Sequence, residues 1–181
     1  MGVERNGAGD SPRIARTARV HPTATIVGNV VLGKRVLVCP HAVLRADEPG
    51  PDGVVQAVVV EDECNIQDLV IVHALGGTSV RIGRATSVAH GAVLHGPCEI
   101  GARCFVGFNS IVFRAVLGDE VVVMHQALVE GVTVATGRHV ASRSAVCREE
   151  EAARLPRVDP AVAAFVERVR RANLRLAAGK A

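Results

Sequence analysis

The sequence predicts an all-β fold, a parallel β-helix of six-residue repeats, with an α-helix at its C-terminal end. An aliphatic residue recurs at every sixth position over most of the 181 residues, and the fourth residue after it is usually small. Gly often follows the aliphatic residue, which is typical of tight bends between short strands. Aromatic residues make up only 2% of the chain, so Val, Leu, Ile and Ala must fill a regular core.

The six-residue step begins at Val20 and breaks twice, first after Leu44 and again after Val72. We expect residues 48–53 (EPGPDG) and 76–79 (GGTS) to form loops that leave a corner of the coil at these breaks. Single five-residue steps shift the frame after Val112. The aliphatic residues of the frame are Val20, Ile26, Leu32, Val38, Leu44, Val54, Val60, Ile66, Val72, Ile82, Val88, Leu94, Ile100, Val106, Val112, Leu117, Val123, Val129, Val134, Val140 and Val146.

The end of the chain leaves the repeat and predicts helices. Residues 149–155 (EEEAARL) suit a short helix before Pro156, and Asp159 suits the N-cap of a second helix with Pro160 at its first position. We expect this amphipathic helix to pack back along the coil rather than to anchor the chain in a membrane. Its apolar stripe consists of Val162, Phe165, Val166, Val169 and Leu176.

These boundaries divide the chain into an N-terminal arm (1–19), a β-helix domain (20–148) and a C-terminal helical segment (149–181). No apolar run has the length of a membrane span, and charged residues interrupt the first nineteen positions, so we expect a cytoplasmic protein without a membrane partner. The net charge of +3 is modest and the chain has four Phe but no Trp or Tyr. We therefore expect no nucleic-acid partner.

The five cysteines form no CxxC pair, and an odd number does not suit a disulfide framework. Cys64, Cys98 and Cys104 hold the place of the small residue in their repeats, so we expect them to be core residues. Cys39 and Cys147 are the other two. A thiolate metal site is not predicted, because such sites favour short paired spacings.

Two histidines occupy the same place in their repeats, since His73 follows Val72 and His95 follows Leu94. Their separation of 22 residues equals one coil of 18 plus the four-residue insertion at 76–79. Their rings should therefore stack on adjacent coils, about 4.8 Å apart, where they can share one metal ion. The remaining histidines outside this column and its neighbourhood are expected to be surface residues: His21, His41, His125 and His139.

His90 has a different place in its repeat and lies on the preceding face, so one chain cannot easily bring it to the same ion. A neighbouring subunit could supply an equivalent His90 and complete three nitrogen ligands, with a position left for water. The same 22-residue arithmetic predicts that Arg45 and Gln67 lie together, one face away from the His column. Asp47 and Asp68 are close to them in the sequence.

Several segments resemble the signature segments of gamma-class carbonic anhydrases: LRADE (44–48), NIQD (65–68), VHAL (72–75), VAHGAVLHGP (88–97) and, in the terminal helix, RANLRLAAG (171–179). The resemblance implies a left-handed β-helix with three hexapeptides per coil and a homotrimer with one divalent metal at each subunit interface. Zinc is the expected metal, with iron or cobalt as alternatives. The implied reaction is the reversible hydration of CO2 to bicarbonate.

The resemblance also implies a role for individual residues. The metal ligands are His73 and His95 from one subunit and His90 from the next. Gln67 orients the nucleophile, Asn65 lies on the substrate side, Glu48 is a candidate for proton transfer, and Asn173 is an active-site residue of the helix. Arg45 pairs with Asp47 and Asp68 around the trimer interface.

Two positions depart from the family pattern. The long acidic loop that follows VHAL in archetypal members, and its proton-shuttling Glu, is replaced by GGTS with Gly76 at that place, and Arg171 stands where the archetype has Tyr. Two alternatives stay open. One is an acyl-CoA thioesterase or a hexapeptide acyltransferase on the same fold, and the other is a non-catalytic trimeric assembly subunit.

Overall fold

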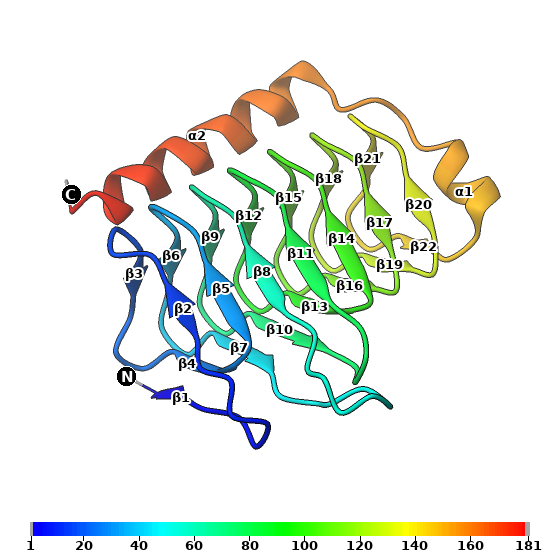
Figure 1. The fold of residues 1–181 in the computed structure, drawn as a ribbon. Helices are drawn as coiled ribbons and strands as arrows, with labels where there is room; N and C mark the ends of the chain where they lie inside the picture. The colour runs from blue at the N-terminus through cyan, green and yellow to red at the C-terminus, as the bar shows by residue number, and fades with distance from the viewer. Residues whose placement is uncertain (1, 180–181) are drawn as a thin grey trace.

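Three parallel β-sheets wrap around one aliphatic core in the computed structural model, which describes residues 2–179 (Figure 1). Successive strands go to successive sheets, and each strand pairs in parallel with the strands three before and three after it. The result is the predicted left-handed β-helix, with one sheet on each of its three faces.

Within the described residues, the sheets contain eight, seven and seven strands. Sheet 1 consists of β1 (Gly2–Glu4), β4 (Thr25–Gly28), β7 (Val43–Ala46), β10 (Ile71–Ala74), β13 (Val93–Gly96), β16 (Ile111–Phe113), β19 (Leu128–Glu130) and β22 (Ala145–Val146). Sheet 2 consists of β2 (Arg13–Ile14), β5 (Val30–Leu32), β8 (Val58–Val60), β11 (Val80–Ile82), β14 (Cys98–Ile100), β17 (Val116–Leu117) and β20 (Thr133–Val134). Sheet 3 consists of β3 (Arg19–Val20), β6 (Leu37–Val38), β9 (Asn65–Ile66), β12 (Ser87–Val88), β15 (Phe105–Val106), β18 (Val122–Val123) and β21 (His139–Val140).

The six-residue period arises because each face contributes one inward aliphatic side chain and each corner one small side chain. Leu44, Val72 and Leu94 stack inside sheet 1 and are fully buried, while the residues beside them in the strands point outward. Val54 is the exception to the predicted frame, because it is 52% exposed and the neighbouring Val55 is buried instead. The interruption of the aliphatic frame at 48–53 therefore extends beyond residue 53 and includes Val54.

Cys64, Cys98 and Cys104 lie in the core as predicted. Burial raises the pKa of each of these three thiols to about 12, so they stay protonated at neutral pH. All five cysteines are free thiols. The structure therefore agrees with a packing role for the three buried residues.

Glycine after the aliphatic residue serves a close approach between coils. A Cβ on Gly83 would lie 2.6 Å from the carbonyl carbon of Gly101 on the next coil, nearer than real Cβ contacts. Residues 2–20, ahead of or at the start of the predicted frame, also join the coil, since they supply β1, β2 and β3. The coil thus begins earlier than the aliphatic period indicates.

The two C-terminal helices form where predicted. Helix α1 covers Glu149–Ala153, and α2 covers Pro160–Ala177, with the Asp159 side chain accepting a hydrogen bond of 2.7 Å from Ala161 N–H. Helix α2 runs back along the coil and contacts β6 and β9 of sheet 3 (Figure 1). The stripe residues that pack on the coil are Val162, Phe165, Val166 and Val169.

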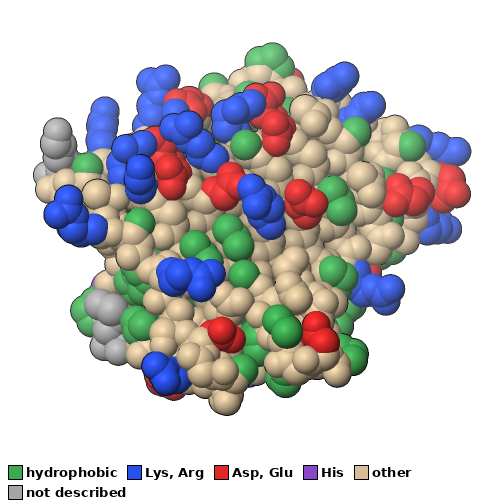
Figure 2. Space-filling model, viewed as in Figure 1, with side chains coloured by type: hydrophobic (Ala, Val, Ile, Leu, Met, Phe, Trp, Pro, Cys, Tyr) green, Lys and Arg blue, Asp and Glu red, His purple; other side chains and the backbone are tan. Residues whose placement is uncertain are grey.

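Leu176 was expected in that stripe but is half exposed, because α2 has passed beyond the apolar cluster of sheet 3 there. Neither helix within residues 2–179 has the length and hydropathy needed to cross a bilayer. On the face seen in Figure 2, basic and acidic side chains are interspersed. Ion pairs such as Arg84–Glu63 and Arg103–Glu120 join neighbouring coils at the corner between sheets 2 and 3.

Candidate metal centre

A column of outward-facing side chains on sheet 1 contains the two stacked histidines. His73 of β10 and His95 of β13 are direct partners in the parallel register, as the 22-residue separation predicts. Their rings meet edge to face, with centroids 5.1 Å apart. His73 Nδ1 and His95 Nε2 lie 3.3 Å apart. Sheet pairing alone therefore brings two imidazole nitrogens together from adjacent coils.

Hydrogen bonds at the far side of each ring determine which nitrogen keeps its lone pair. His95 Nδ1 donates to the Gly96 carbonyl oxygen at 3.1 Å, which leaves the lone pair of the neutral ring on Nε2. His73 Nε2 lies 3.3 Å from Asp47 Oδ1, a pure acceptor when ionised, which leaves the lone pair on Nδ1. Both lone pairs then face each other, an arrangement that favours a cation between them.

The distance between these nitrogens fits a metal. Two nitrogens bound tetrahedrally at 2.0–2.1 Å are about 3.3–3.4 Å from each other, which matches the His73–His95 separation. Within residues 2–179 of one chain, no three His, Cys, Asp or Glu side chains converge to form a complete metal-binding group. The pair offers two nitrogens to a metal, and a complete site would need a third ligand from outside this group.

Acidic side chains flank the pair on the side of the first loop. The Arg45 guanidinium donates two hydrogen bonds to Asp47 Oδ2, at 3.0 and 2.8 Å, while Asp47 Oδ1 faces His73. Glu48 Oε1 lies 3.5 Å from His73 Nε2, and Glu48 Oε2 accepts a hydrogen bond of 3.2 Å from Gly76 N–H. The short second loop thus holds Glu48 beside the histidine pair, with 45% of its side chain exposed.

The predicted proximity of Arg45 and Gln67 is wrong. Arg45 lies in the His column itself, paired with His73 across 28 residues, because the first loop adds ten residues to the coil rather than four. Gln67 follows β9 on sheet 3, one coil above Cys39. Arg45 pairs with Asp47 within the chain, whereas the partner of Asp68 here is His90.

His90 lies at the corner between sheets 3 and 1, away from the pair, as its place in the repeat predicts. Its Nδ1 is 3.1 Å from Asp68 Oδ2, which leaves Nε2 as the nitrogen with a lone pair. Half of the His90 side chain is exposed. The ring is therefore oriented by a carboxylate and directed to a surface that one chain leaves open.

The three predicted amide residues meet in one hydrogen-bonded cluster. Gln67 Nε2 donates to Asn65 Oδ1 at 3.0 Å and to Asn173 Oδ1 at 3.1 Å, and Asn173 Nδ2 donates to Asn65 Oδ1 at 3.2 Å. Asn65 is buried and its amide donates to Ser87 Oγ at 2.7 Å. Helix α2 thus brings Asn173 onto two residues more than a hundred positions away.

These amides and His90 line one cavity of about 290 Å³ between sheet 3 and α2. Most of its wall is apolar, with the rings of Phe105, Phe108 and Phe165 among the lining side chains. The Cys39 thiol donates to Gln67 Oε1 at 3.7 Å, and burial together with the Asp68 charge raises the pKa of this thiol to about 11. Cys39 therefore stays protonated.

Three residues near the histidines and amides were not predicted from the sequence. Ser87 bonds Asn65, Phe108 lies against the His90 ring, and Phe113 lies edge-on to His95 at 5.5 Å. The period contains the signal, because Phe113 holds the place of His95 one coil later. His125 was assigned to an unrelated surface place, but it is half-buried and has the same place as His90, two residues after a frame valine.

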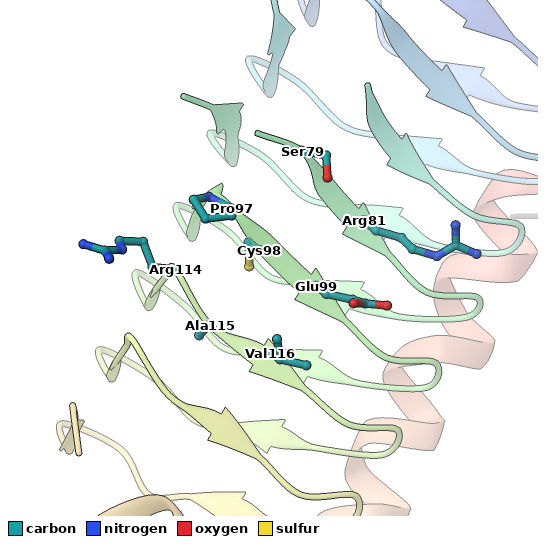
Figure 3. Close-up of a pocket in the computed structure, with 8 residues that line it drawn as sticks. All are labelled: Ser79, Arg81, Pro97, Cys98, Glu99, Arg114, Ala115 and Val116. Atoms are coloured by element: carbon teal, nitrogen blue, oxygen red, sulfur yellow. The ribbon is translucent and has the colours of Figure 1, made fainter. Parts of the chain in front are cut away.

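A second cavity lies at the corner between sheets 1 and 2, and no histidine is among the residues that line it (Figure 3). Its charged side chains point apart, with Arg114 at one end and Arg81 and Glu99 toward the other (Figure 3). Arg81 is already paired with Glu61. The candidate chemistry therefore lies on sheets 1 and 3.

A parallel hexapeptide β-helix with a stacked histidine pair on one face and an amide cluster under the terminal helix defines the class of this protein. The carbonic anhydrase of Methanosarcina thermophila is 32% identical over 190 residues, covering 93% of this chain and 74% of that protein. The chain belongs to the gamma-class carbonic anhydrase family.

Two further comparisons bear on the fold and on the extent of the match. The carboxysome assembly protein CcmM of Nostoc sp. is 35% identical over 177 residues, covering 92% of this chain and 31% of that protein. The chain thus spans about a third of that relative's length. A hexapeptide transferase family protein from Anaplasma phagocytophilum superposes with a TM-score of 0.81 at 24% identity, covering 99% of this chain and 98% of that one. No family model matches the sequence.

Proposed function

We propose that this protein is a metal-dependent carbonic anhydrase that hydrates CO2 reversibly to bicarbonate and a proton. The observation that carries the proposal is the 3.3 Å separation of His73 Nδ1 and His95 Nε2, with both lone pairs directed at each other. The similarity to the Methanosarcina carbonic anhydrase supports the same reaction. We take zinc as the resident metal, with iron or cobalt equally suited to three imidazoles.

The proposal requires a homotrimer. His73, His95, Asp47 and Glu48 are on sheet 1 and its loop, whereas His90 and the amides are at the edge of sheet 3. A neighbouring copy would bring its His90 edge to sheet 1 of the first copy, so that each interface contains one complete site. Exposed apolar side chains on sheet 1 and the adjoining corner, such as Ile71, Ile111 and Leu69, are suited to burial in that interface.

Each group of side chains then has a defined task. A bound divalent metal lowers the pKa of water to about 7, the value known from zinc carbonic anhydrases, so hydroxide is available at neutral pH. The amides of Asn65, Gln67 and Asn173 hold one another, which fixes their orientation toward the substrate. The apolar wall beside them suits CO2, which has no net dipole, better than it suits charged bicarbonate. Glu48, partly exposed, is placed to pass a proton to buffer.

The proposal is tested by stopped-flow CO2 hydration with protein purified without oxygen and reloaded separately with zinc or Fe(II), at several buffer concentrations. We expect turnover that depends on the metal and rises with buffer, because no acidic loop exports the proton. His90→Ala should lose the metal. Full metal content in that variant contradicts the site, and no turnover in any metal-loaded trimer contradicts the reaction.

A second function is favoured by the match to the carboxysome assembly protein over 92% of this chain. In that case the trimer would be an assembly subunit that does not turn over CO2. Absence of hydration at every metal loading, together with recovery of a specific heteromeric partner, would favour this function. Hydrolysis of acyl-CoA thioesters by the same preparations would instead favour an acyl-CoA thioesterase on this fold, and acyl transfer to an acceptor would favour a hexapeptide acyltransferase.

A further inference from the structure

All four phenylalanines lie near the residues of the candidate centre, although the rest of the core is aliphatic. Phe108 lies against His90 with ring centroids 5.5 Å apart and planes inclined by 32°. Phe113 lies edge-on to His95 at 5.5 Å. Phe105 and Phe165 line the cavity beside the amides and meet edge to face at 5.8 Å. This placement suggests a function for the rings beyond filling space.

One of these phenylalanine rings, Phe108, stacks with two histidine rings along one corner. His90, Phe108 and His125 each come two residues after a frame valine, on three successive coils. Backbone hydrogen bonds keep them in register: Asn109 N–H donates to the His90 carbonyl at 3.0 Å, and Gln126 N–H donates to the Phe108 carbonyl at 2.8 Å. The period of the β-helix therefore stacks one side chain of each coil on the next.

His125 anchors the middle ring. Phe108 and His125 stack almost parallel, with centroids 4.3 Å apart and planes inclined by 11°. Phe108 N–H also donates to His125 Nδ1 at 3.0 Å. A Cβ on Gly107 would lie 2.9 Å from this Nδ1, so glycine lets the His125 ring approach the preceding coil. Phe105 contacts His125 edge-on at 6.2 Å and is itself buried under α2.

The stacked rings restrict the orientation of the His90 side chain further than Asp68 alone does. Asp68 holds Nδ1, but a single hydrogen bond lets an exposed ring pivot about that contact. Phe108 lies beside the ring, with the two ring centroids 5.5 Å apart, and restricts the pivot. We propose that Phe108, held in place by His125, is a positioning residue that presents His90 Nε2 to the metal site of the neighbouring subunit. This proposal rests on the proposed function for the presence of the metal, and on the ring contacts for the positioning.

The test measures metal affinity, because a ligand that must be ordered on binding binds more weakly. Dissociation constants for Zn²⁺ and Co²⁺ are obtained by competition with a chromophoric chelator for Phe108→Ala, His125→Asn and His125→Phe. Phe108→Ala and His125→Asn should weaken binding about tenfold. His125→Phe keeps a stacking ring without the acceptor nitrogen and should retain wild-type affinity. His21→Asn, at an exposed corner, is the matched control.

Wild-type affinity in both Phe108→Ala and His125→Asn would overturn the proposal, as would equal weakening in His125→Phe and His125→Asn. A second measurement does not depend on metal. Crystal structures of the metal-free protein should show one His90 ring orientation in the wild type and several in His125→Asn, while a single unchanged orientation in the variant would overturn the proposal. If the wild type binds no metal, the proposed function fails, and the crystal structures still decide the positioning role.

Discussion

His73 Nδ1 and His95 Nε2 lie 3.3 Å apart, although 22 residues separate them in the chain. The parallel register of β10 and β13 makes them direct partners, and the four-residue loop at 76–79 does not disturb that register. The hydrogen bonds to Gly96 and Asp47 then turn both lone pairs inward. A pair of fixed nitrogens suited to a metal is thus a consequence of strand pairing together with two hydrogen bonds behind the rings.

Removing one nitrogen of this pair should abolish metal binding. We expect His95→Ala to fall from about one metal ion per chain to none, because catalytic sites of this kind use three protein ligands. His41→Ala, at an exposed corner turn, is the control and should keep the metal. Metal content is measured by mass spectrometry after gel filtration, and a loaded His95→Ala protein would contradict the assignment.

The carboxylate behind His90 should matter for affinity more than for folding. In Asp68→Asn the ring loses its charged acceptor at 3.1 Å, and we expect zinc to bind roughly 10- to 100-fold more weakly. Asp159→Asn keeps a good helix N-cap far from the site and should bind zinc like the wild type. Titration with a competing chelator measures both constants, and equal affinities would show that Asp68 does not act through His90.

The contact between the two loops should tolerate no side chain at residue 76. A Cβ on Gly76 would lie 2.4 Å from the Pro49 carbonyl oxygen, so Gly76→Ala must move the loops and weaken the bond from Gly76 N–H to Glu48. We expect a loss of about 1–3 kcal/mol in the free energy of unfolding. Gly7→Ala, with nothing within 4 Å, should be close to neutral. Urea unfolding compares the two, and equal stability would contradict the contact.

The buried thiols predict a loss of stability in alkali. Cys64, Cys98 and Cys104 have pKa values of about 12 when folded, against 9.0 for the ordinary thiol, because burial disfavours the thiolate. Above pH 9 the unfolded chain binds fewer protons than the folded one, so stability falls as pH rises from 9 toward 12. The chain has no Tyr to obscure this titration.

Urea unfolding at pH 8, 9.5 and 10.5 measures this slope. Cys64→Ala should make the fall of stability with pH less steep, because one of the three buried thiols is removed. Cys147→Ser, which replaces an exposed thiol, should leave the slope unchanged. A thiol reagent at pH 8 should label Cys147 rapidly and the three buried thiols only after unfolding. The same slope in both variants would mean that burial of Cys64 does not control its protonation.

Features that depend on a regular coil or on adjacent residues could be predicted from the sequence. The stacked histidines depend only on an 18-residue coil and one short insertion, and both are visible as breaks in the aliphatic period. The N-cap of α2 depends on Asp159 and Pro160, which are adjacent in the chain. In these cases regular strand pairing or the local geometry of a helix end determines the outcome.

Predictions of which residues lie together failed at two places, the first of them across the loop at residues 48–53. Arg45 and Gln67 were expected together because four residues were assigned to that insertion, whereas ten are inserted and Arg45 pairs with His73. His125 was assigned to a place unrelated to that of His90, although both come two residues after a frame valine and the coils keep them in register. The aliphatic period shows where a loop interrupts the coil, but it does not show how many residues the loop inserts.

The sequence was enough to predict the β-helix, its buried aliphatic frame and the His73–His95 pair, since these follow from a regular period and parallel pairing. Only the tertiary structure brought Asn173 to Asn65 and Gln67, because the position of α2 depends on how its apolar stripe packs against sheet 3. Contacts between elements depend on packing over the whole surface, and no local spacing encodes them.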